Sequence, residues 1–321
     1  MPASGNVAVF GPSPMLSITI ESLTSEGGDD IHLHAAGQGV WVARMAAELG
    51  ASPILCGFIG GETGTVLRPL LEQLPIELRL VETSEASGCY LHDRRDGERR
   101  PLAQSAALPP SRHEIDELFS STVAAALDSD VLALCGPYPG EALPLEIYGN
   151  LVADVRANGT PVVVDLSPPR LGSALEGGPD LVKINDWELA KYIEGPVDTD
   201  ERMRAAAQRL LDKGAGAAIV TRAEEPALVV RGEEAWALIP PRFERGSREG
   251  CGDSMMGALA ACMAAGLGWE ETLRTSAAAG AANFLRSGLG SGSRSVVEDL
   301  ARRVELRRLQ PAGAHPGRGS T

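Results

Sequence analysis

The pattern of apolar and polar positions changes along the chain. From about residue 131 onward, short apolar runs alternate with longer helical segments, which is typical of a mostly parallel sheet covered by helices. Buried strands are predicted at 6–10, 53–58, 131–134, 162–165, 181–184 and 217–221, a hairpin at 228–230 and 235–239, and helices at 40–50, 65–74, 145–158, 187–193, 201–213 and 270–285. The sequence therefore predicts an α/β protein.

Two stretches in the first hundred residues alternate as half-exposed strands instead. Residues 18–23 and 31–34 form the first, and residues 77–100 form the second, with a strong hairpin signal at Asp96 and Gly97. Four arginines flank this turn, and they either grip an anion or belong to a solvated hairpin tip. These stretches predict a smaller, more exposed sheet.

A glycine turn before an apolar helix has the features of a phosphate site. Gly250 and Gly252 bracket Cys251, and Asp253 opens about a dozen residues of Met, Ala, Leu and Cys. The first N–H groups of such a helix lack intrahelical partners and carry the positive end of its dipole, so they can hold a phosphate oxygen. A carboxylate beside that anion suggests removal of a hydroxyl proton. The alternative is an ordinary helix start.

A second candidate lies where a buried strand gives way to a helix, the edge at which open α/β sheets bind ligands. Lys183 stands in the strand, and Asn185 and Glu188 lie three residues apart on the first helical turn, where they could position a hydrated Mg²⁺. The alternative is a helix N-cap with a capping glutamate. Thr221 ends a further strand and is, taken alone, an ordinary loop start.

Composition excludes several classes of protein. The chain has 321 residues and a formal net charge of −14, the wrong sign for holding nucleic acid or an anionic membrane. The five cysteines are scattered and odd in number, without the spacing of a disulfide framework or a zinc site. No basic segment precedes an apolar run, and no apolar window approaches membrane-spanning length, so we expect a cytoplasmic protein.

Four motifs occur together in one order. They are 36–44 (A-G-Q-G-V-W-V-A-R), 57–64 (G-F-I-G-G-E-T-G), 183–189 (K-I-N-D-W-E-L) and 250–254 (G-C-G-D-S). With them the chain resembles the PfkB (ribokinase-like) carbohydrate kinases, and most of all the branch of 1-phosphofructokinase and tagatose-6-phosphate kinase. The resemblance implies a three-layer α/β/α kinase domain at 1–308, with a mostly parallel central sheet and a small β-sheet lid from about 12–36 and 77–105. Such lids often pair into a homodimer. Residues 309–321, rich in Pro, Gly and Ala, are predicted to be a mobile tail.

The resemblance also implies roles for single residues. Asp253 would act as the base on the acceptor hydroxyl, and the amides of Gly250, Cys251 and Gly252 would hold the developing charge as ATP is cleaved. Asn185 and Glu188 would hold Mg²⁺ through water. The implied cofactor-binding residues are Lys183, Asn185, Glu188, Thr221 and Asn283, with adenine between the loop after Thr221 and the 279–283 face of a helix.

The acceptor end departs from the family pattern. The implied substrate residues are Ser17, Gly37, Gln38, Gly39, Trp41 and Tyr90. Ser17 stands where the family has an aspartate, Gln38 where it has a lysine, and Trp41 where it has an asparagine. Gly88 stands near the position of a lid arginine that grips substrate phosphate, and the glycines after Thr221 are missing. Because each lost charged hydrogen bond costs about 1.5–3 kcal/mol, we expect a changed ligand.

Three functions are weighed on these grounds. The first is an ATP- and Mg²⁺-dependent kinase acting on a hydroxyl of a sugar, sugar phosphate or related polyol, or on a nucleoside-like substrate admitted by a more aromatic pocket. The second is a binding or regulatory protein that keeps the kinase fold without catalysis, favoured by the altered lid. A dinucleotide-dependent oxidoreductase is disfavoured, because the glycines after the first strand do not make G-x-G-x-x-G.

Overall fold

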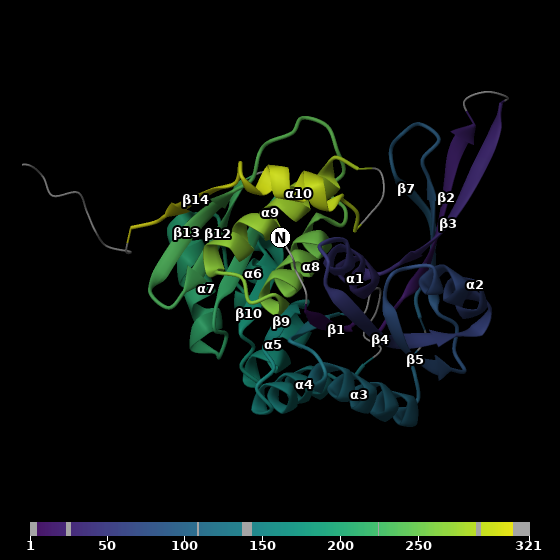
Figure 1. The fold of residues 1–321 in the computed structure, drawn as a ribbon, viewed down its shortest axis with the longest axis horizontal. Coiled ribbons are helices and arrows are strands. Elements are labelled where there is room, and N and C mark those ends of the chain that lie inside the picture. The colour runs from purple at the N-terminus through teal and green to yellow at the C-terminus, as the bar shows by residue number, and fades with distance from the viewer. Residues whose placement is uncertain are drawn as a thin grey trace, which may run out of the picture.

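The computed structural model describes residues 5–23, 27–107, 109–136, 143–223, 225–286 and 290–310. Within these residues the chain builds one large sheet and one small sheet (Figure 1). In spatial order the large sheet consists of β14 (Glu305–Arg308), β13 (Glu234–Ile239), β12 (Glu225–Arg231), β11 (Ala218–Arg222), β10 (Leu181–Asn185), β9 (Val162–Asp165), β8 (Val131–Cys135), β1 (Asn6–Phe10), β4 (Ser52–Gly60) and β5 (Glu77–Thr83). The seven strands from β11 to β5 are parallel, and β12, β13 and β14 extend the sheet antiparallel.

Helices cover both faces of the large sheet. One layer consists of α1 (Gln38–Glu48), α2 (Gly61–Glu72), α8 (Cys251–Ala264), α9 (Trp269–Phe284) and α10 (Arg294–Ala301). The other consists of α3 (Arg112–Leu127), α4 (Glu146–Ala157), α5 (Pro168–Glu176), α6 (Asp186–Ile193) and α7 (Asp200–Asp212). Because both faces are covered, β8 is buried at every residue, which explains its continuous apolar sequence.

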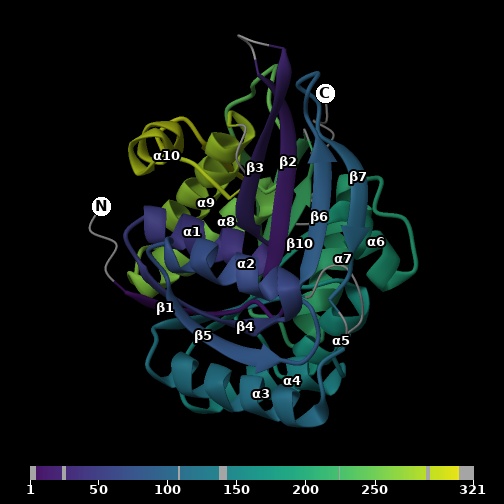
Figure 2. The same cartoon turned by 90° about the vertical axis from the view of Figure 1, so that its right-hand side faces the viewer.

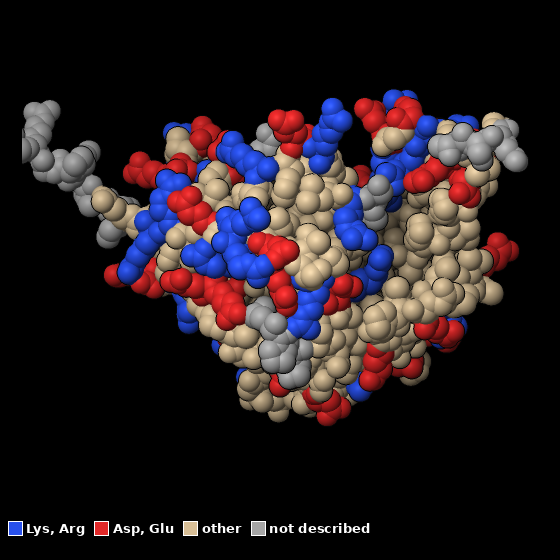
Figure 3. All heavy atoms as spheres, turned by 45° about the horizontal axis from the view of Figure 1, so that its top comes forward, with Lys and Arg blue, Asp and Glu red and all other residues tan. Residues whose placement is uncertain are grey.

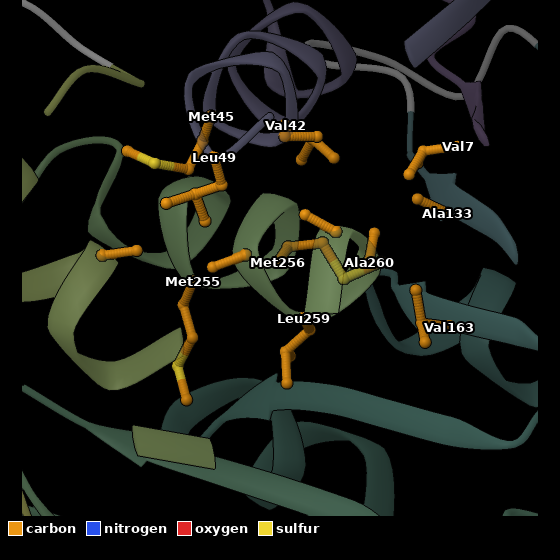
Figure 4. Packing of buried hydrophobic residues seen from close by; sticks show 14 of the residues in the cluster. Val7, Val42, Met45, Leu49, Ala133, Val163, Met255, Met256, Leu259 and Ala260 are labelled. Carbon is orange, nitrogen blue, oxygen red and sulfur yellow. The ribbon is translucent and has the colours of Figure 1, made fainter. Parts of the chain in front are cut away.

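Helix α8 occupies the centre of its layer. Its residues from Ser254 to Cys262 are all buried, because α8 packs between α1, α9 and the sheet. Figure 4 shows Met256 and Ala260 of α8 between Val42 of α1 and the strand residues around Val163. At Gly257 the helices approach so closely that a Cβ would lie 2.4 Å from the carbonyl oxygen of Val42. The start of α8 is thus fixed against the sheet edge.

The small sheet rises from one side of the molecule, at the right in Figure 1 and facing the viewer in Figure 2. Its order is β3 (Gly28–Ala36), β2 (Met15–Leu23), β6 (Gly88–Asp93) and β7 (Arg100–Ser105), with β2 and β6 parallel. The predicted turn between β6 and β7 is present, and Gly97 has the positive φ of 86° that such turns need. We call this sheet the lid.

The predicted three-layer α/β/α fold with a small second sheet is confirmed. One boundary is wrong: the lid was expected to include residues from 77 on, but β5 pairs with β4 in the large sheet. Its half-exposed alternation arises because β5 is an edge strand. The sequence pattern did not predict α3, α5, α10 or β14. The predicted tail lies outside the described residues from 311 on. In the described part of the chain, no helix has the length and apolar character needed to span a membrane.

Candidate active site

The glycine turn before α8 forms an open helix start. Gly250 is the N-cap and has φ 74° and ψ −2°, in the left-handed region that favours glycine. Among the described residues no side chain caps this helix. The first-turn amides at Cys251 and Gly252 therefore suit an anionic ligand.

A buried ion pair lies directly beneath this helix start. Lys183 of β10 donates a 2.6 Å hydrogen bond from Nζ to Oδ2 of Asp165 in β9, and the two side chains are only 7% and 8% exposed. A Cβ at Gly252 would lie 2.7 Å from this Nζ. Burial lowers the pKa of Lys183, but the carboxylates of Asp165 and Asp253 outweigh it and raise the pKa above its usual value. The ammonium thus stays charged next to the turn.

Asp253 has the side chain that is best suited to accept a proton in this site. Burial and the negative charge of Asp165 raise the pKa of Asp253 to about 7, although Lys183 opposes the shift. A carboxyl that titrates near neutral pH is well matched to general base catalysis at that pH. Asp165 was not among the predicted site residues. In the sequence, Asp165 could have been recognised as an aspartate that follows three consecutive valines at the end of a predicted strand.

Asn185 and Glu188 form a complete capping box at the start of α6. The Glu188 amide donates to Oδ1 of Asn185 (2.8 Å), and the Asn185 amide donates to Oε2 of Glu188 (3.3 Å). This is the alternative that the sequence left open. Burial, followed by the charge of Asp165, raises the pKa of Glu188. In the described residues no cluster of three His, Cys, Asp or Glu side chains could hold a metal ion directly.

A cavity of about 420 Å³ opens beside the ion pair, within the size range of small-molecule sites. Five of the predicted residues line it: Lys183, Asn185, Thr221, Cys251 and Gly252. The opposite wall comes from α9, through Gly280, Ala281 and Phe284. In Figure 3 several Lys and Arg side chains border a hollow between the lid and the rest of the molecule. The cavity can take a ligand as large as a nucleotide.

Asn283 does not occupy the predicted place on that wall. It is fully buried, its Nδ2 donates to the carbonyl oxygen of Glu249 (2.7 Å), and its Oδ1 accepts from the amide of Ser291 (3.2 Å). The amide of Asn283 therefore supports the loop before α8 from behind. The family resemblance implied a nucleotide contact for Asn283, but in the structure α9 turns this side chain inward.

The order of the strands separates the site into two sides. The cavity lies over β10 to β13, whereas Asp253 is coupled electrostatically to Asp165 at the end of β9 and to Cys135 at the end of β8. Gln38 lies on the same side, because its Oε1 accepts from the Gly136 amide (3.0 Å) and its Nε2 donates to the carbonyl oxygen of Asp165 (3.3 Å). Asp253 thus stands between the cavity and the side that carries the predicted acceptor residues.

The other predicted acceptor residues gather under the lid. Ser17 and Tyr90 are register partners on β2 and β6, both are buried, and Tyr90 packs with Met15, Ala36 and Trp41 of α1. The glycines at 37 and 39 are required by close packing: a Cβ would lie 2.7 Å from Ser13 O and 2.5 Å from Gly11 Cα, respectively. The structure therefore brings all six predicted substrate residues to the region where the lid meets α1.

The four arginines of the β6–β7 hairpin divide into two kinds. Arg94, Arg95 and Arg100 pair with acidic residues of the lid itself, and the last two are exposed, as expected of a solvated tip. Arg99 is only 15% exposed and reaches the large domain, with its Nη1 3.2 Å from Oε2 of Glu249. In the sequence, Arg99 was named only as one of four arginines that either grip an anion or belong to a solvated hairpin tip.

Comparisons with known proteins agree with this geometry. The model of the pfkB family of carbohydrate kinases matches residues 10–295. The 1-phosphofructokinase of Rhodobacter capsulatus is 30% identical over 92% of this chain and 95% of its own length. The ATP-dependent 6-phosphofructokinase isozyme 2 of Escherichia coli is 31% identical over 78% of this chain and 82% of its own length. The structure of phosphofructokinase-2 from Escherichia coli matches with a TM-score of 0.81 and 26% identity, over 93% of this chain and 99% of that chain. The predicted resemblance is confirmed.

Proposed function

Because the chain belongs to the pfkB family of carbohydrate kinases, a family that uses ATP, we propose that it transfers the γ-phosphoryl group of ATP to a hydroxyl of a sugar phosphate. The similarity to two phosphofructokinases supports a phosphorylated acceptor over a free sugar. The observation that carries the proposal is the position of Asp253, whose pKa is raised to about 7 at an uncapped helix start beside Lys183.

In the proposed reaction each group has one task. Asp253 accepts the proton of the acceptor hydroxyl as that oxygen bonds to the γ-phosphorus, while the bond between the γ-phosphorus and the oxygen that bridges it to the β-phosphate breaks and ADP leaves. The amides at Gly250, Cys251 and Gly252 and the ammonium of Lys183 stabilise the negative charge of the transferred group. The nucleotide occupies the cavity beside Thr221, on the opposite side of Asp253 from the lid. This placement puts donor and acceptor on either side of the base.

Mg²⁺ fits this arrangement only through water. Asn185 and Glu188 supply the oxygen ligands that Mg²⁺ prefers, but their capping box already uses Oδ1 of Asn185 and Oε2 of Glu188. An ion held by water molecules on these groups would shield the phosphate charges during transfer. Lys183 lies close to the turn at Gly252, and its charge also interacts with that of Glu188, so its ammonium acts on both parts of the proposed phosphate site.

Assembly and location form part of the proposal. We place the protein in the cytoplasm and expect a homodimer through the lid. Ile31, Leu33 and Leu102 of β3 and β7 are exposed, which supports burial of a lid face in a partner. One matching structure is the tetrameric inhibited form of phosphofructokinase-2 from Escherichia coli, which supports association of subunits in a relative.

Release of ADP over a panel of sugars, sugar phosphates and nucleosides tests the proposal, with Asp253→Asn as the critical variant. We expect turnover of a sugar phosphate in the parent protein and a fall of about 10³-fold or more in the variant, because a general base supplies about 10²–10⁴-fold. Asp116→Asn, on the exposed face of α3, is the matched control. Above pH 7 Asp253→Asn should be at least as thermally stable as the parent, because it removes a charge that burial disfavours.

Two outcomes would favour the rival functions. Binding of ATP in calorimetry without turnover of any panel member indicates a regulatory protein that keeps the fold. Turnover of nucleosides alone indicates that the pocket around Trp41 and Tyr90 has exchanged its substrate class.

A further inference from the structure

Arg99 links the lid to the loop before α8. We call the amides of Gly250, Cys251 and Gly252, at the end of this loop, the proposed anion hole. Arg99 lies on the β6–β7 hairpin, and its Nη1 is 3.2 Å from Oε2 of Glu249, the residue directly before Gly250. Its Nη2 donates to Nδ1 of His92 (3.3 Å), and its Cζ lies 5.5 Å from the centre of the Tyr90 ring. The guanidinium is therefore held on the inner face of the lid, beside the predicted acceptor residues.

Two buried polar groups at the Arg99 guanidinium lack a hydrogen-bond partner among the described residues. Among the described residues, the Nε of Arg99 has no hydrogen-bond acceptor. The hydroxyl of Tyr90 lies near Ser17 and Arg99 without a hydrogen bond of good geometry to either. A buried polar group left unsatisfied costs free energy. Both groups can donate a hydrogen bond, so the ligand that satisfies them is one rich in acceptor oxygens.

The charge around these donors points to an anion. Burial, and then the charge of Arg99, lowers the pKa of His92 to about 4, so His92 is neutral near pH 7. Burial, and then His32, lowers the pKa of His34 on the neighbouring strand β3. Arg99 is thus the charged donor in this group, and the carboxylate that it meets, Glu249, is half exposed and free to separate.

We propose that Arg99 recognises the anionic group of the acceptor, exchanging Glu249 for a phosphate oxygen while the Tyr90 hydroxyl donates to a second oxygen. This inference rests on the proposed kinase function and names the residue that selects its substrate. It accounts for Gly88, which stands near the position of the lid arginine that the family resemblance implies: the positive charge is supplied eleven residues later (99 − 88), from the other end of the hairpin.

Binding and turnover of fructose 1-phosphate and fructose 6-phosphate, with fructose as the uncharged reference, test this role. In Arg99→Gln we expect KM for the phosphorylated sugar to rise by about 10- to 100-fold, the loss typical of a charged hydrogen bond. KM for ATP should be unchanged, kcat should fall by less than about threefold, and turnover of fructose should be unaffected. Arg99→Lys should recover part of the loss. Arg95→Gln, an exposed arginine of the same hairpin, should behave as the parent protein.

The variant Glu249→Gln tests the same exchange by removing the carboxylate that pairs with Arg99. Releasing Arg99 should raise affinity for the phosphorylated sugar, measured as ligand-induced thermal stabilisation, and this gain should disappear when Arg99→Gln is added. Equal affinity in parent and Arg99→Gln, or a gain that survives in the double variant, overturns the inference while leaving the kinase function intact. If no fructose phosphate stabilises the parent protein, the inference fails. If no panel member is turned over, the proposed function fails, whatever the binding shows.

Discussion

The phosphate end and the acceptor end of this site are built in different ways. At the phosphate end, the start of α8 and the neighbouring strands β9 and β10 bring backbone amides close to the side chains of Lys183 and Asp165. These two side chains are buried and hydrogen-bonded to each other. At the acceptor end, the lid meets the loop before α8 through one partly exposed ion pair, between Arg99 and Glu249. The first end is rigid and set by sheet topology, whereas the second depends on how the lid sits, so substrate choice can change there without disturbing phosphoryl transfer.

The largest effect should come from the buried pair at the rigid end. Lys183→Met removes the charge nearest the anion hole and leaves Asp165 buried without its partner. We expect kcat to fall by about 10²–10³-fold, the range seen when one donor to a developing anion is lost. Stability should fall by about 3–5 kcal/mol, the cost of breaking a buried pair. Thermal unfolding and steady-state kinetics measure the two losses separately.

The pH profile distinguishes Lys183 from Asp165. If Asp253 must be ionised, kcat/KM rises with pH through an apparent pKa of about 7. The positive charge of Lys183 lowers that pKa and the negative charge of Asp165 raises it. Lys183→Met should therefore move the acidic limb to higher pH, and Asp165→Asn should move it to lower pH. Shifts in the same direction, or none, would contradict the assignment of Asp253 as the base.

Two glycines of α8 separate catalysis from packing. At Gly252 an added Cβ meets the Nζ of Lys183, whereas at Gly257 it meets the backbone of α1. We expect Gly252→Ala to lower kcat by about 10-fold or more with a loss of stability near 1 kcal/mol, because the ammonium must move. Gly257→Ala should cost about 1–3 kcal/mol by overpacking but leave the activity of the folded protein close to normal. The reverse pattern would show that the anion hole does not depend on Lys183.

The same contrast explains what could be predicted from the sequence. The turn at Gly250 and the strand end at Lys183 could be predicted because the glycines, apolar runs and polar residues that mark them are neighbours in the sequence. Asp165 was missed because only the pairing of β9 with β10 brings its carboxylate to Lys183. Arg99 was left undecided because it lies in the hairpin just before β7, and its orientation depends on how this hairpin packs against the loop that carries Glu249. The capping box at Asn185 was foreseen as an alternative, since its spacing is local as well.

The smallest effect should come from the lid hydroxyl that has no good partner. Tyr90→Phe removes a buried hydroxyl that has no hydrogen-bond partner in the described part of the chain, so the free energy of unfolding should be unchanged or slightly higher. If the hydroxyl donates to the acceptor, KM for the sugar phosphate should rise by about 3- to 10-fold while kcat and KM for ATP stay constant. Tyr148→Phe, whose buried hydroxyl also lacks a partner among the described residues but belongs to α4 away from the lid, is the control. A Tyr90→Phe variant with unaltered KM would reduce Tyr90 to a packing residue, and acceptor recognition would then rest on Arg99 alone.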